Sequence, residues 1–156
     1  MTFKEEKKFH GHYAAYSHAN QKVHLLLPNT FMNHSGRAVQ AIANFYKLPP
    51  QAILVAHDDL DLSAGVCKLK TDGGHGGHNG LRDIIGQLGN QDFHRVRIGI
   101  GHPGHRDRVL NYVLGKPSPT DKEHIDYSID DVLSVMDWVL TGQMQLAMNQ
   151  LHTRDD

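Results

Sequence analysis

The chain has 156 residues, of which 39% are hydrophobic, so it can form a domain with a buried core, and no apolar run approaches the length of a membrane span. Its formal net charge of -1 gives no overall attraction to nucleic acid, so RNA binding would depend on local basic patches. The single cysteine, Cys67, excludes an internal disulfide, and the charged first eight residues do not resemble a secretion signal. We therefore expect a cytoplasmic protein.

The first half of the chain alternates between strand and helix patterns. Residues 11–17 and 22–27 are typical of a β-hairpin, with a turn at residues 19–20. Apolar residues at helical spacing predict a helix over residues 35–47, which two prolines end. The continuous apolar run at residues 53–56 predicts a central strand that is covered on both faces.

The second half continues the alternation. Further elements are predicted as strands at residues 65–70 and 95–101, a short helix after residue 80, a long helix at residues 120–140 and a last helix at residues 144–151. This order predicts one α/β domain over residues 1–156, with a twisted mixed β-sheet flanked by helices.

Residues 73–80 form a loop that contains five glycines, two histidines and an asparagine. Such a density of glycine indicates that the backbone must come close to another group. The loop opens the predicted short helix, so its free N–H groups can face an anionic ligand. Asn79 in this loop, Asn33 after the hairpin and Asp58 after the central strand are expected to converge, because ligand sites gather at the carboxyl ends of strands.

Each of these residues also has a simpler interpretation. Asp58 can orient a histidine for general-base catalysis. Alternatively, Asp58, Asp59 and Asp61 form a solvated acidic turn or a helix cap; a divalent-metal site is a further alternative. Asn79 can orient a water or a substrate carbonyl, or it can be an ordinary turn residue.

Residues 31–33 leave two alternatives open. Phe31, Met32 and Asn33 can form the rim of a pocket. Alternatively, Phe31 and Met32 belong to the core, while Asn33 or Ser35 caps the following helix.

Histidines and basic residues recur at short spacing along the chain. His75 with His78, and His102 with His105, have a spacing compatible with zinc, although no matching partners accompany them. The basic pairs at i, i+2 are either solvated or part of a phosphate-binding patch; they are Lys68 with Lys70, Arg95 with Arg97, and Arg106 with Arg108.

Five motifs, with their order and gaps, resemble the bacterial peptidyl-tRNA hydrolase family from about Lys8 onward. They lie at residues 31–36, 56–61, 73–80, 93–104 and 113–117. The resemblance implies an enzyme that cleaves the ester between a peptide and the 3′-terminal ribose of tRNA, releasing tRNA from abandoned translation products. It also implies a monomer that acts on peptidyl-tRNA with no metal, no organic cofactor and no membrane partner.

The resemblance also implies roles for individual residues. Asp58 would polarise a histidine base, while Asn33 and Asn79 would hold the terminal nucleotide and the peptide and help to orient the attacking water. Lys70 and Arg97 would bind tRNA phosphate. The same crevice would further be lined by Phe31, Met32, Gly76 and His78.

Members of the family carry their first strand and their catalytic histidine before the region that corresponds to Lys8. By this resemblance we expect the chain to lack its first strand and the general-base histidine, and hence to be marginally stable and of little or no activity. Two alternatives follow: an RNA-binding relative without catalysis, and a nucleotide-binding module that uses the glycine loop. The second is weakened because no lysine-serine pair follows the loop.

Overall fold

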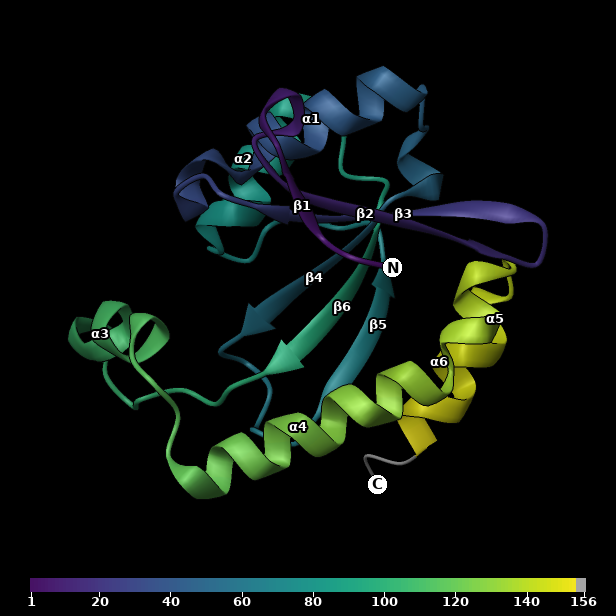
Figure 1. Ribbon diagram of the computed structural model, residues 1–156. Helices are drawn as coiled ribbons and strands as arrows, with labels where there is room; N and C mark the ends of the chain where they lie inside the picture. Colours follow the sequence, from purple (N-terminus) through teal and green to yellow (C-terminus); the bar gives the residue numbers. More distant parts are fainter. Residues whose placement is uncertain (154–156) are drawn as a thin grey trace. The chain divides into compact units, whose positions relative to one another are not determined.

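The computed structural model describes residues 1–153, except for the side chain of Arg106, and these residues form two compact units (Figure 1). The first unit comprises Met1–Ile53 and Thr71–His94. The second comprises Leu54–Lys70 and the described part of Arg95–Asp156. Each unit has its own three-stranded sheet and its own helices.

The sheet of the first unit is an antiparallel meander in the order β1-β2-β3. Its strands are β1 (Lys4–Glu6), β2 (Gly11–His18) and β3 (Gln21–Pro28), and the last two are the predicted hairpin. Ala19 and Asn20 in the turn both have positive φ, 50° and 63°, as a two-residue type I′ connection requires. β1 was not predicted, because its Lys-Glu-Glu sequence has no apolar alternation and it is held by pairing with β2.

Two helices of the first unit pack against each other, and both were predicted. α1 (Ser35–Tyr46) buries Ala38 and Ile42, and α2 (Asn79–Leu88) buries Leu81 and Ile84. Three short 3-10 turns complete this unit: η1 (Lys7–Phe9), η2 (Met32–His34) and η3 (Pro50–Ala52).

An aromatic cluster fills the space between the hairpin and α1. Phe9 is buried against Tyr13, Phe45 and Tyr46, and the His24 ring stacks on Tyr46 with a centroid distance of 4.0 Å. The Tyr13 hydroxyl is hydrogen bonded to His24 Nδ1 at 2.6 Å. Burial, together with Tyr46, raises the pKa of Tyr13 to about 12, whereas burial and then the charge of Lys22 lower the pKa of His24.

The sheet of the second unit is mixed and has the order β4-β6-β5. Its strands are β4 (Leu54–Asp59), β5 (Cys67–Thr71) and β6 (His94–Gly99), of which the ends Thr71 and His94 belong to the first unit. Figure 1 shows β4 and β6 pointing the same way and β5 the opposite way, in agreement with the backbone hydrogen bonds between them.

The position of β4 corrects one prediction. The apolar run at residues 53–56 was expected to be a central strand covered on both faces, but β4 is an edge strand and Ala56 is exposed. Apolar composition indicates which faces a strand tends to bury and does not determine its place in a sheet. The mixed α/β class is confirmed, with two sheets where one was expected. The absence of a first strand stays a prediction, as does a single domain.

The core of the second unit forms between its sheet and its C-terminal helices. The helical elements are η4 (Arg106–Arg108), α3 (Val109–Leu114), α4 (Pro119–Ser134), α5 (Met136–Leu140) and α6 (Met144–His152). Cys67 is buried in this core, and its thiol donates to Ser128 Oγ at 3.1 Å. The predicted long helix is divided at Val135, which is 1% exposed and has a non-helical backbone. Among residues 1–153, no helix combines the length and the hydrophobicity needed to cross a membrane.

Candidate functional site

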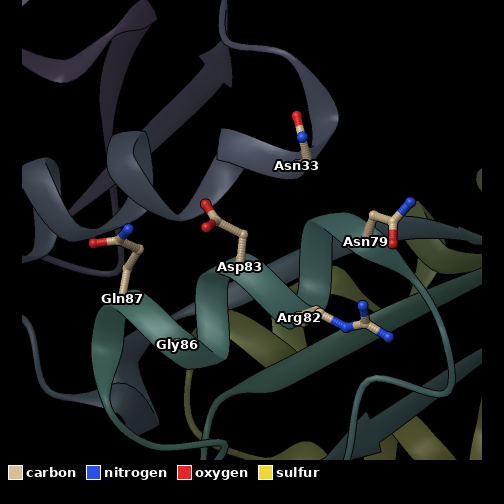
Figure 2. Close-up of a pocket in the computed structure, with 6 residues that line it drawn as sticks. All are labelled: Asn33, Asn79, Arg82, Asp83, Gly86 and Gln87. Atoms are coloured by element: carbon tan, nitrogen blue, oxygen red, sulfur yellow. The ribbon is translucent and has the colours of Figure 1, made fainter.

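The two asparagines singled out in the sequence lie in one pocket of the first unit (Figure 2). The pocket has a volume of about 380 Å³. It is lined by Asn33, Asn79, Arg82, Asp83, Gly86 and Gln87. Asn33 belongs to the turn η2, which leads into α1, and Asn79 is the first residue of α2, so the starts of two helices supply the two amides.

The turn that carries Asn33 is fixed against α2 by its neighbour Met32. A Cβ added at Gly80 would lie 2.6 Å from Met32 Sδ, so only glycine at this position lets the sulfur come so close. The Ser35 hydroxyl donates to the Met32 carbonyl oxygen at 2.8 Å, which closes the turn on the other side. These contacts hold Asn33 next to the first turn of α2.

The exposure of Phe31 and Met32 decides between the two alternatives left by the sequence. Phe31 is 82% exposed and Met32 is 53% exposed, so neither belongs to the core. The helix cap is also not at Asn33 or Ser35, because the N-cap residue of α1 is His34. A surface site is therefore favoured for residues 31–33, although of these three only Asn33 lines the pocket.

The glycine loop has the backbone conformations that its sequence indicates. Gly73, Gly76 and Gly77 have positive φ, at 102°, 57° and 84°, which other residues adopt only with strain. His78 is the N-cap of α2, and its Nδ1 accepts the N–H of Leu81 at 3.2 Å. The expectation that the start of α2 leaves its N–H groups for a ligand is thus corrected in part, because His78 already occupies one of them.

In the second unit, the acidic cluster after the apolar run is not merely a solvated turn. Asp59 Oδ2 accepts from Arg97 Nε at 2.7 Å, with the two side chains 13% and 26% exposed, and Asp59 Oδ1 accepts the N–H of Asp61 at 2.8 Å. Asp58 lies beside Asp59 near the end of β4, and consecutive strand residues face opposite sides.

The predicted phosphate-binding residues lie on adjacent strands. Lys70 is an exposed residue of β5, and Arg97 belongs to β6. Both alternate with buried residues of the same core cluster, Leu69 and Val96, so they share the sheet face opposite that core. Because the ion pair to Asp59 uses Arg97 Nε, the two Nη groups can still bind a phosphate.

The histidines considered for zinc make local hydrogen bonds. Nδ1 atoms of three of them accept the N–H two residues later: His75 from Gly77, His102 from Gly104 and His105 from Asp107. No group of three or more potential metal ligands occurs among the residues with described side chains, so the zinc and divalent-metal alternatives gain no support.

Three polar residues of the pocket were not predicted: Arg82, Asp83 and Gln87. The available signal was the helical periodicity of α2, whose apolar positions at 81, 84, 85 and 88 leave these side chains on the opposite face. Asn33 and Asn79 are brought together as predicted, whereas Asp58 belongs to the second unit and its convergence with them stays a prediction.

Comparisons with known proteins agree on one family. The model of the family described as peptidyl-tRNA hydrolase matches residues 1–156. The peptidyl-tRNA hydrolase of Pseudomonas entomophila is 57% identical over 153 residues, covering 97% of this chain and 79% of that protein, and the one of Pseudomonas putida is 56% identical over 155 residues, covering 99% and 80%. A crystal structure of peptidyl-tRNA hydrolase from Acinetobacter baumannii has a TM-score of 0.93 at 49% identity, covering 96% of this chain and 76% of that one.

Proposed function

Because the chain belongs to the peptidyl-tRNA hydrolase family, and is therefore a hydrolase, we propose that it cleaves the ester between a peptide or N-blocked amino acid and the 3′-terminal ribose of tRNA. The observation that carries this proposal is the pocket in which Asn33 and Asn79 lie together. A side-chain amide both donates and accepts hydrogen bonds, as a ribose hydroxyl, a peptide group and an ester carbonyl require.

The proposed reaction adds water to the ester carbonyl carbon, breaks the bond to the ribose oxygen and returns a proton to that oxygen. Asn79 would donate to the carbonyl or orient the water, and Asn33 would hold the terminal nucleotide. Asp58 would accept the N–H of a histidine that acts as the base, which fixes the tautomer of the imidazole. No metal enters this scheme.

Lys70 and Arg97 would bind the phosphates of the tRNA. Their position on adjacent strands and the orientation of Arg97 by Asp59 support this role. A guanidinium held in place by a carboxylate loses less side-chain entropy when it binds a phosphate.

The comparisons give no support to the expected lack of the histidine base or to the expected loss of activity. Proteins that match 96% to 99% of this chain at 49% to 57% identity carry the name peptidyl-tRNA hydrolase. We therefore propose a catalytic role in translation, in which the protein releases tRNA from the peptidyl-tRNA left by abandoned translation. A cytoplasmic location and a monomeric state stay predictions.

The decisive experiment measures the release of tRNA from N-acetyl-aminoacyl-tRNA, with the unblocked aminoacyl-tRNA as the comparison substrate. We expect cleavage of the blocked substrate, a reduced kcat for Asp58→Asn with nearly unchanged tRNA affinity, and a reduced kcat/KM for Asn33→Ala and Asn79→Ala. Asn44→Ala, which removes an exposed amide at the end of α1, is the matched control. Binding of RNA at low salt without any cleavage would instead establish the non-catalytic RNA-binding alternative.

A further inference from the structure

The start of α1 obtains its polar partner from α2. The first N–H groups of a helix lack partners within the helix and favour a nearby negative charge. Within the residues that the structure describes, the N-cap His34 makes no side-chain bond to α1, and the first turn of this helix contains no acidic residue. Asp83 of α2, 47 residues away from Gly36 in sequence, supplies the missing hydrogen-bond acceptor and the missing negative charge, since its Oδ2 accepts the N–H of Gly36 at 2.7 Å.

The two helices come close enough for this bond because position 36 has no side chain. A Cβ added at Gly36 would collide with the backbone carbonyl of Asp83 and would lie 2.8 Å from its Oδ2. One turn further along both helices, Gln40 Nε2 donates to the carbonyl oxygen of Gln87 at 2.8 Å. The two hydrogen bonds therefore fix the register of α1 against α2.

The same register continues to the two asparagines. Asn33 lies three residues before Gly36, and Asn79 lies four residues before Asp83, so this pair is about one helical turn ahead of the Gly36–Asp83 bond. Figure 2 shows Asp83 extending from α2 toward the helix that begins beside Asn33. We therefore expect a change at the Gly36–Asp83 bond to alter the separation of the two amides.

We propose that Asp83 is a positioning residue, which sets the distance between Asn33 and Asn79 by anchoring the start of α1 to α2. This inference rests on the proposed function, in which both amides hold the acylated 3′ end of the tRNA. Asp83 then acts through the backbone of Gly36, and its hydrogen-bonding oxygen matters more than its negative charge.

The test uses a stable probe, adenosine that carries an N-acetylated amino acid in amide linkage at the 3′ carbon. We expect Asp83→Ala to weaken binding of the probe by about tenfold, the usual size of a lost charge-assisted hydrogen bond. Asp83→Asn, which keeps the shape and one acceptor oxygen, should stay within about threefold of wild type. Asp92→Ala is the matched control, because it removes an exposed carboxylate of the same unit.

A second perturbation separates positioning from direct contact with the probe. Gly36→Ala forces the same junction apart but does not remove the Asp83 carboxyl group, so we expect the same loss of about tenfold. In the double variant Gly36→Ala with Asp83→Ala, the loss should be no larger than that of the stronger single variant, because both act on one junction. If Asp83→Ala does not fold by circular dichroism, Gly36→Ala and Asp83→Asn carry the test.

Three results overturn the inference. The first is wild-type binding of the probe by Asp83→Ala or, where that variant does not fold, by Gly36→Ala. The second is an equal loss of binding in Asp83→Asn and Asp83→Ala, and the third is a double variant in which the losses of binding add. Asn33→Ala and Asn79→Ala are measured with the same probe. If these two bind it as wild type does, the proposed function itself fails. If they weaken binding while Asp83→Ala does not, only the role of Asp83 fails.

Discussion

Gly80→Ala tests whether the contact between the η2 turn and α2 serves the pocket more than it serves stability. The new Cβ would lie 2.6 Å from Met32 Sδ, and 3.0 Å and 3.2 Å from two atoms of the His78 ring. To restore an ordinary van der Waals distance, the sulfur must retreat by about 1 Å. Because this sulfur is near the flexible end of a side chain that is 53% exposed, it can move without opening the core.

The expected effects on stability and on activity therefore differ. Overpacking costs about 1–3 kcal/mol in a rigid core and less here, and an alanine in a helix gains up to about 1 kcal/mol over glycine, so the free energy of unfolding should change by less than about 1 kcal/mol. A shift of about 1 Å in a substrate-positioning group can cost up to a hundredfold in rate. Since Met32 directly precedes Asn33, we expect kcat/KM on N-acetyl-aminoacyl-tRNA to fall by about tenfold.

Urea unfolding and steady-state hydrolysis of N-acetyl-aminoacyl-tRNA measure the two quantities. Gly86→Ala calibrates the stability measurement, because a Cβ at Gly86 would meet no described atom within 4 Å. This variant therefore measures only the gain in stability from replacing a helical glycine by alanine. If Gly80→Ala keeps wild-type kcat/KM, the position of Met32 has no bearing on the site. If it loses more than about 2 kcal/mol of stability, the contact is structural and the reasoning above is wrong.

Three further predictions follow from contacts within single units. Burial lowers the pKa of His24 in the folded protein, so the imidazole binds a proton more readily in the unfolded chain than in the folded one. The stability that neutral His24 contributes is therefore present above its ordinary pKa of about 6.5 and is lost as the pH falls below that value. Urea unfolding should accordingly show wild type losing stability relative to His24→Gln between about pH 7 and pH 5, and parallel profiles would contradict this. Lys70→Ala and Arg97→Ala should each reduce the slope of log affinity for tRNA against log salt by about 0.7–0.9, unlike Lys4→Ala, and an unchanged slope would remove that residue from the phosphate site. Asp59→Ala should cost about 1–3 kcal/mol in urea unfolding, because it leaves the half-buried guanidinium of Arg97 without its 2.7 Å partner, whereas Asp61→Ala, an exposed control, should cost less than about 0.5 kcal/mol.

Local patterns in the sequence predicted most helices and strands, since periodicity and turn residues act over a few positions. The hairpin, α1 and α6 lie within one or two residues of their predicted bounds, and α2 begins two residues before the predicted start of that helix. Two differences depend on tertiary structure, which local patterns do not contain. The apolar run of β4 did not indicate an edge position, and the intact helical periodicity did not indicate the break at Val135, where a buried valine ends α4.

The site could be predicted only in part for the same reason. Asn33 and Asn79 stood out because Asn33 follows the predicted hairpin and Asn79 lies in the glycine loop, yet the sequence at each position fitted a helix cap or a turn as well. The exposure of Phe31 and Met32 and the shared pocket separate these interpretations. Asp83 could not be predicted, because its partner is a backbone N–H 47 residues away and its own neighbours are ordinary helix residues.

The glycines of the two asparagine motifs have a reciprocal role that neither motif reveals alone. Gly36 in the first turn of α1 lets the backbone and carboxylate of Asp83 approach, and Gly80 in the first turn of α2 lets Met32 Sδ approach from the η2 turn. Each helix start is therefore shaped to receive a group from the segment that carries the other asparagine. The glycine loop was expected to bring the backbone close to another group, and at Gly80 that group belongs to the protein itself. The shape of the pocket is thus determined by helix packing. Substitutions at Gly36 and Gly80 should therefore weaken binding of the acylated 3′ end of the substrate more than binding of the tRNA phosphates.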